Sequence, residues 1–420
     1  MTGTDDTPVR PSRRTLLSGL AGLGGLAGGG LIGHKVSEER TRAREEELTG
    51  LTEPARRSAT HKDGLPPALS LPTPAHIHVL ALDVTGKDAS TVRNNAEHVL
   101  QTLGEEIDAL HEEGVDARAP GTAAQDLHPA SLGITLGLGA ELFQRGELQD
   151  RLPDHMEPLP DFDTDHLVSE WCDGDLMLHV AAEDPVVVST AVGHLLSLTR
   201  DHARVRWSLP GFQRSTVAAE DPDATPRNLM GQIDGTVNPH PSEAMFDVQV
   251  LTTHSEPGWE WMDGGTYVVI RRIRMLLDDW FTLEPEEREE AVGRRLPDGA
   301  PLGGRHEDDL PDFSARGPDG NPVIAENAHI RLAGPENTLG ARMLRRGFSY
   351  DLGWDHDGNR QAGLLFTAWQ ADPRTGFVPV QQALDEGGDA LNAYIRHEGS
   401  ALFAVPANHK ARLAPFRDQK

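Results

Sequence analysis

The chain carries one pattern twice, as DLMLHVAAEDP at residues 175–185 and as GLLFTAWQADP at residues 363–373. Each copy begins with a short apolar run, which is typical of a buried strand. Each copy ends in an Asp-Pro step, and proline is well suited to the first turn of a helix. Both stretches therefore predict a strand followed by a turn, and their similarity indicates an internal duplication.

The residues around the first copy complete a familiar unit. Between 89 and 110, apolar residues recur at helical spacing. The expected elements are a strand at 76–82, a helix at 89–110, strands at 132–138 and 175–181, a helix at 184–198 and a strand at 204–209. This β-α-β-β-α-β order is that of a ferredoxin-like unit.

The residues around the second copy show a weaker repeat of the same order of strands and helices. It comprises a strand at 266–273, a helical stretch at 284–295, a strand at 363–369 and a helical stretch at 378–384. We therefore predict an α+β fold of two ferredoxin-like halves, at 75–215 and 216–420, resembling a dimeric α+β barrel with helices packed on antiparallel sheets. A chance echo of common elements is the alternative interpretation.

The composition excludes several classes of protein. A formal net charge of −27 over 420 residues argues against a nucleic-acid partner, because phosphate binding requires a basic surface. Cys172 is the single cysteine in this sequence, so an intrachain disulfide, a Cys-rich zinc site and an iron–sulfur cluster are excluded. A covalent C-x-x-C-H haem attachment is excluded for the same reason.

The first residues have the features of a targeting segment. Arg13 and Arg14 precede an uncharged, glycine-rich stretch from Thr15 to Gly33. A basic pair followed by a weakly apolar segment is the twin-arginine export pattern. We expect a signal segment at 1–36, a charged and Pro-rich linker at 37–74, and export to the periplasm, cell envelope or exterior. An uncleaved membrane anchor is the alternative.

Three segments hold candidate functional residues. In MGQIDGTVNP (230–239), two glycines bracket Asp234, and glycine allows the backbone to approach a bulky planar ligand. The local alternative is a β-turn with an Asx cap. In RRGFSY (345–350), a buried Arg345 would stabilise developing negative charge, whereas a solvated arginine pair is the alternative.

The third segment, NAHIRLAGP (327–335), places His329 beside apolar residues. A neutral imidazole is a natural axial ligand for non-covalent haem iron, although a lone histidine is more often structural. The second ring nitrogen of such a ligand requires a hydrogen-bond acceptor that sets the tautomer. Asp312 and Glu326 are both candidates for that acceptor.

These three segments, in this order, resemble the dye-decolourising peroxidase family over residues 76–406. With the signal segment, the similarity is to its twin-arginine-exported branch, which includes the deferrochelatase/peroxidase type of iron-uptake operons. The resemblance implies a duplicated ferredoxin-like fold and one non-covalent haem b in the C-terminal half. It also implies a peroxidase that reduces H2O2 and oxidises dyes, phenolics or another one-electron donor through an oxoferryl intermediate.

The resemblance assigns roles residue by residue. Asp234 matches the distal aspartate, a general acid–base, Arg345 the distal arginine and His329 the proximal iron ligand. Residues expected to contact the haem are Gly235, Thr236, Val237, Arg331, Gly334, Pro335, Glu336 and Arg345. Candidates for an electron relay to the surface are Tyr350, Trp354, Trp369 and Tyr394.

The expected partners are H2O2, a one-electron donor and the twin-arginine export machinery. Two other functions remain open at this stage. One is a haem-handling protein that releases iron or delivers haem without oxidative turnover. The other is a peroxidase dedicated to one exported protein client.

Overall fold

The computed structural model describes residues 65–69, 73–215, 218, 224–253 and 258–417. The expected signal segment at 1–36 and most of the expected linker at 37–74 lie outside these residues. Within the described ranges, no helix has the length and apolar character required to cross a membrane.

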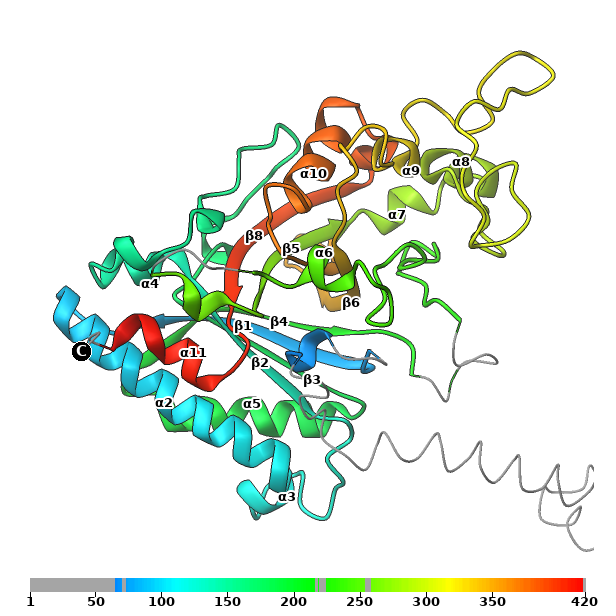
Figure 1. Ribbon diagram of the computed structural model, residues 1–420. Helices are drawn as coiled ribbons and strands as arrows, with labels where there is room; N and C mark the ends of the chain where they lie inside the picture. Colours follow the sequence, from blue (N-terminus) through cyan, green and yellow to red (C-terminus); the bar gives the residue numbers. More distant parts are fainter. Residues whose placement is uncertain (1–64, 70–72, 216–217, 219–223, 254–257, 418–420) are drawn as a thin grey trace, which may run out of the picture. The chain divides into compact units, whose positions relative to one another are not determined.

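The N-terminal half is a four-stranded antiparallel sheet with two main helices. Its strands are β1 (His76–Val84), β2 (Gly133–Gly139), β3 (Leu176–Ala182) and β4 (Ala203–Phe212), paired in the order β4-β1-β3-β2. Helices α2 (Ala89–Glu113) and α5 (Pro185–Thr199) lie side by side against this sheet (Figure 1). This is the predicted ferredoxin-like unit.

The C-terminal half repeats this strand order. Its strands are β5 (Thr266–Met275), β6 (Leu344–Trp354), β7 (Arg360–Gln370) and β8 (Ile395–Val405), paired as β8-β5-β7-β6. The repeated stretches 175–185 and 363–373 include β3 and most of β7, which are the third strands of the two halves. The predicted duplication is therefore confirmed, although the sequence did not predict β6 or β8 as strands.

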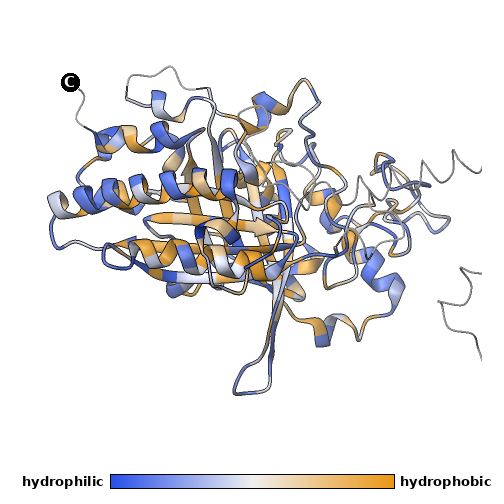
Figure 2. Cartoon of the chain, turned by 90° about the horizontal axis from the view of Figure 1, so that it is seen from below, coloured by the Kyte–Doolittle hydropathy of each residue, from blue (hydrophilic) through white to orange (hydrophobic). Residues whose placement is uncertain are grey.

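Two seams join the sheets into a closed eight-stranded barrel. At one seam β2 pairs with β8 through Leu138↔Ala404 and Gly139↔Phe403, and at the other β4 pairs with β6 through Phe212↔Ser349. Alternate strand residues therefore face the barrel interior, as Leu344, Phe348 and Tyr350 of β6 do. The residues between them face the helices or loops outside, and Figure 2 shows apolar colour concentrated on the strands behind the helices.

The Asp-Pro steps explain where helical structure begins. Asp184 caps α5 by accepting hydrogen bonds from the backbone N–H of Val186 and Val187, with Pro185 in the first turn. In the second copy, Asp372 accepts from the Arg374 N–H at 2.9 Å and closes a turn, and α10 (Phe377–Glu386) begins only afterwards. The same dipeptide therefore starts a helix in one half and a turn in the other.

Shorter elements fill the connections. Between β5 and β6 they are α7 (Leu277–Trp280), α8 (Pro285–Val292) and α9 (His329–Leu332). The other short helices are α3 (Val115–Arg118), α4 (Ala140–Arg145), α6 (Phe246–Val250) and α11 (His409–Leu413). Single 3-10 turns are η2 (Pro67–Leu69), η3 (Gln149–Arg151), η4 (Asp154–Met156), η5 (Ser169–Trp171), η7 (Glu260–Met262), η8 (Ala390–Ala393) and η9 (Ala414–Phe416).

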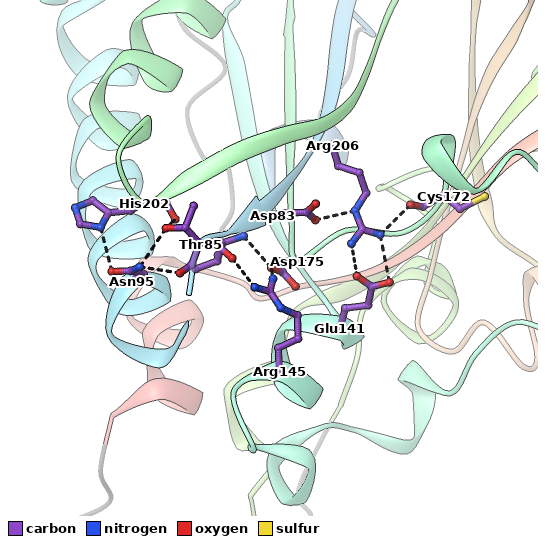
Figure 3. A network of polar contacts seen from close by, with 10 residues as sticks. Asp83, Thr85, Asn95, Glu141, Arg145, Cys172, Asp175, His202 and Arg206 are labelled. Atoms are coloured by element: carbon purple, nitrogen blue, oxygen red, sulfur yellow. Dashed lines mark hydrogen bonds and ion pairs between the residues drawn. The ribbon is translucent and has the colours of Figure 1, made fainter. Parts of the chain in front are cut away.

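A polar network holds the N-terminal half together at one end of its sheet (Figure 3). The fully buried Asp175 carboxylate accepts a hydrogen bond from the Val84 N–H at 2.8 Å and forms an ion pair with Arg145. Arg206 bridges Asp83 at 2.7 Å and Glu141. Burial raises the pKa of Asp175 to about 6, against the opposing effect of Arg145.

Candidate active site

A cavity of about 350 Å³ lies in the C-terminal half, within the size range of cofactor pockets. Its walls come from the outward faces of β5, β6 and β7, from β8, and from the connections that contain α9, α10 and η8. Apolar side chains form most of the wall: Ile233, Val237, Ile273, Met275, Val292, Leu310, Phe313, Ile330, Met343, Leu364, Phe366, Phe377, Val380, Leu384, Leu391 and Ile395. Such a surface fits a large planar apolar ligand.

Asp234 and Arg345 meet on one part of this wall. Asp234 lies on a loop whose glycines, Gly231 (φ 86°) and Gly235 (φ 123°), adopt backbone angles that side chains disfavour. Arg345 projects from β6 on the outward face, and its Nη1 lies 3.9 Å from Asp234 Oδ1. A Cβ at Gly347 would lie 3.5 Å from Asp234 Oδ2, so this residue of β6 lies directly beside the carboxylate.

His329 lines the same cavity from the start of α9. Its Nδ1 lies 2.7 Å from Oδ2 of Asp389, a residue that is only 3% exposed. Asp389 follows α10 and caps η8, and the N–H of Ala390 donates to Asn327 O at 3.1 Å, which holds the two segments together.

Asp389 is therefore the acceptor behind His329, and both sequence candidates were wrong. Asp312 caps its own turn by accepting from the N–H groups of Ser314 and Ala315. Glu326 is exposed. Each is closer in sequence to His329 than Asp389 is, but the end of α10 brings Asp389 into contact.

The electrostatics of the pair suit an iron ligand. Burial alone would lower the pKa of His329, but the charge and hydrogen bond of Asp389 outweigh burial and raise it. The bond to Asp389 occupies Nδ1, and no described residue donates to or accepts from Nε2. An imidazole held by a carboxylate, with its other nitrogen available in an apolar cavity, is the arrangement that binds a haem iron. The residues present therefore fit this cofactor.

The other residues expected to contact haem divide into two groups. Gly235, Thr236, Val237, Gly334 and Pro335 line the cavity, and the Thr236 hydroxyl donates to Glu307 at 2.7 Å. The structure does not bring Arg331 or Glu336 to the wall. Arg331 instead donates to the carbonyl oxygens of Phe313, Ile324 and Ala325, and Glu336 is exposed on a turn.

Sequence reasoning missed four basic residues on the wall, Arg271, Arg294, Arg342 and His397. Arg271 is 1% exposed and forms an ion pair with Asp165. Arg294 donates to the carbonyl oxygens of Gly299 and Glu307, at 2.6 and 2.9 Å. Burial lowers the pKa of His397 to about 3, so it is neutral. No motif surrounds these residues, and only the tertiary structure places their side chains on the wall.

The four relay candidates occupy different environments. Tyr350 and Trp369 are fully buried inside the barrel, and Tyr394 packs edge-on against Trp280 with ring centroids 5.2 Å apart. Trp354, at the end of β6, is 68% exposed. Of these four residues, Trp354 alone presents a large aromatic surface to solvent.

Comparison with known proteins identifies the family of the chain. Residues 66–213 match the family described as Dyp-type peroxidase, N-terminal, and residues 225–410 match Dyp-type peroxidase, C-terminal. The chain is 49% identical to a dye-decolorizing peroxidase of Thermobifida fusca, over 98% of both chains. It is 31% identical to a deferrochelatase of Yersinia pseudotuberculosis, over 96% of this chain and 95% of that one.

Solved structures show the same relationship. Ferric DtpA from Streptomyces lividans is 42% identical, with a TM-score of 0.77 over 84% of this chain and 95% of that chain. A DyP-type peroxidase from Cellulomonas bogoriensis is 36% identical, with a TM-score of 0.76 over 86% and 99% of the two chains. The chain therefore belongs to the Dyp-type peroxidase family and is a haem-dependent peroxidase.

Proposed function

We propose that the cavity holds one non-covalent haem b whose iron is bound by His329 Nε2, and that Asp234 and Arg345 act on peroxide in the same cavity. The observation that carries this proposal is the His329–Asp389 pair, at 2.7 Å, in a wall shared with the Asp234–Arg345 pair. Haem, when bound, supplies the redox chemistry of peroxide reduction.

The proposed roles of the two distal residues follow from their chemistry. Reduction of H2O2 to two waters consumes two protons and two electrons, and one proton must move between the peroxide oxygens. The Asp234 carboxylate accepts that proton from one oxygen and returns it to the other, as a general acid–base. The Arg345 guanidinium, always charged, stabilises the negative charge that develops as the O–O bond breaks.

The electrons come from one-electron donors, for which we propose dyes and phenolics. A donor too large for the cavity requires a surface residue to pass electrons inward, and Trp354 has the exposure for this role. A single exported protein is the competing donor. Equal turnover of unrelated phenols supports small donors, whereas rapid oxidation of one co-exported protein with slow dye turnover supports the dedicated client.

The experiment is the absorption spectrum of purified haem-loaded protein before and after one equivalent of H2O2. A peroxidase changes its Soret band within the mixing time and returns to the starting spectrum when a donor is added. A haem-handling protein keeps its spectrum, or loses haem iron without turnover. The 31% identity with a deferrochelatase makes this second function worth measuring on the same sample.

We also propose export by the twin-arginine machinery to the periplasm, cell envelope or exterior. The support is Arg13-Arg14 followed by the uncharged stretch from Thr15 to Gly33. Replacement of both arginines by lysine is expected to retain the protein in the cytoplasm. Cell fractionation measures this, and unchanged export of the double variant contradicts the proposal.

A further inference from the structure

The backbone of Arg345 lies at an incomplete seam of the barrel. Along one edge β6 pairs with β7, with Arg345 opposite Ala368. Along the other edge β6 pairs with β4 at a single position, Phe212↔Ser349. The backbone groups of Arg345 that point to this edge therefore have no partner strand, and unpaired buried backbone groups are costly.

The side chain of Asn238 takes the place of the missing strand. Its Nδ2 donates to the carbonyl oxygen of Arg345 at 2.9 Å, and the Arg345 N–H donates to its Oδ1 at 2.9 Å. This is the pair of bonds that a residue in a neighbouring antiparallel strand makes. We call it the Asn238 clip.

The Asn238 clip joins the two catalytic candidates through the backbone. Asn238 follows Asp234 on one loop, whereas Arg345 lies on β6. The Asp234 carboxylate and the Arg345 guanidinium are 3.9 Å apart, which is beyond hydrogen-bonding distance. The two side chains therefore form an ion pair without a hydrogen bond, which leaves their separation loosely constrained. Other anchors of the loop include Asp234 N–H to Pro226 O, Thr236 to Glu307 and Trp280 Nε1–H to Met230 O, and none of these bonds involves β6.

We propose that Asn238 is a positioning residue, whose amide sets the separation of Asp234 and Arg345 so that both contact one peroxide. This inference rests on the proposed function of those two residues. Without the clip the loop and the strand move independently, and misplacement by about 1 Å can cost on the order of 100-fold in rate.

The test compares Asn238→Leu and Asn238→Ala with Asn359→Ala, all as haem-loaded protein. Leucine keeps the volume and removes both bonds. Asn359 makes its bonds within the tip of the β6–β7 hairpin and serves as the matched control. The first measurement is hydrogen exchange at the Arg345 amide, which we expect to accelerate in both Asn238 variants and to stay at the wild-type rate in the control.

The second measurement is stopped-flow kinetics. We expect the rate constant for reaction with H2O2 to fall roughly 10- to 100-fold in the Asn238 variants. Haem content and the later rate of donor oxidation are expected to remain within about twofold. A general loss of packing would change the peroxide rate constant, the haem content and the rate of donor oxidation together. A decrease in the peroxide rate constant alone therefore identifies a positioning role.

The outcomes separate the two proposals. Unchanged exchange at the Arg345 amide shows that the clip does not form. Faster exchange with an unchanged peroxide rate shows that the clip does not position the pair. A wild-type protein that binds haem but does not react with peroxide contradicts the proposed function, whereas the exchange measurement still reports on the clip.

Discussion

The two halves share a strand order but differ in the connection between their first two strands. In the N-terminal half this connection contains α2, a helix of 25 residues that packs its apolar face on the sheet. In the C-terminal half the same connection spans residues 276–343 and contains only the short helices α7, α8 and α9. The sheet face that α2 covers in one half is therefore open in the other, and the cavity lies there.

The comparison also shows how one fold can serve two purposes. In the N-terminal half, the sheet face that contacts the helices is part of a hydrophobic core, and residues such as Val99, Leu103 and Leu178 are almost fully buried. In the C-terminal half, Asp234, His329 and Arg345 lie where the other half has core residues. The side chain of each is about 30% exposed. Substitutions in the two halves should therefore separate cofactor chemistry from stability.

The largest expected effect is loss of haem from His329→Ala. The variant lacks the imidazole that we propose as the iron ligand, so the Soret band should decrease and haem should dissociate readily. The matched control is His128→Ala, because His128 is exposed and lies in the N-terminal half. Equal haem affinity of the His329 variant and wild type would remove His329 from its role.

The second effect concerns Arg345→Leu. A preorganised charged donor is worth about 3 kcal/mol in a transition state, so the rate constant for reaction with H2O2 should fall on the order of 100-fold. Haem binding should change far less. Arg204→Leu, at an exposed position on β4, is the control from the other half and should react at the wild-type rate in stopped-flow measurements.

These effects follow from residues that the sequence identified, whereas other parts of the site were not predictable. Strand β3 and residues 363–369 of β7 were predictable because each is a short apolar run. Strand β6 was missed because Arg345 faces the cavity and Arg346 is buried in the barrel. Two adjacent charged residues interrupt the alternation of apolar and polar residues that is typical of a strand. In β8, charged residues and Gly399 interrupt the apolar pattern in the same way.

Asp389 was missed for a different reason. Its contact with His329 depends on where α10 ends and on the bond from Ala390 N–H to Asn327 O. Both are properties of tertiary packing, and neither produces a local motif. Spacing along the chain identifies partners within one element, but it does not identify partners that two distant connections bring together.

A third, smaller effect is expected from Asp389→Asn. The amide can accept from Nδ1–H but carries no charge, so the pKa of His329 in the haem-free protein should decrease, as NMR titration can measure. Haem affinity should fall roughly 10- to 100-fold, which is typical when a carboxylate behind a metal-binding histidine is lost. Asp385→Asn is the control, since Asp385 accepts instead from the N–H groups of Asp163 and Thr164.

The smallest effect on the site, and the clearest contrast between the halves, is expected from Asp175→Asn in the N-terminal half. Burial raises the pKa of Asp175 to about 6, so folding favours its protonated form. The stability that this group contributes is complete below its unfolded pKa, near 4, and is lost as pH rises through 6.

Asparagine does not ionise, so the Asp175→Asn variant should not lose stability as pH rises through 6. Relative to wild type, the free energy of unfolding of the variant should therefore increase between pH 4 and pH 7, by up to about 3 kcal/mol for a shift of roughly two units. Urea unfolding at a series of pH values measures this difference. Asp201→Asn, at an exposed position in the same half, is the matched control for the chemical change from Asp to Asn.

The opposite slope for Asp175→Asn would mean that the ion pair with Arg145 outweighs burial, so that the carboxylate is favoured in its charged form. In either case the haem content and the peroxide rate constant should equal those of wild type, because Asp175 directly precedes β3 in the N-terminal half and is not on the cavity wall. A change in haem content or in the peroxide rate constant would show that the N-terminal half also contributes to the site. The separation of stability and cofactor chemistry between the two halves would then be wrong.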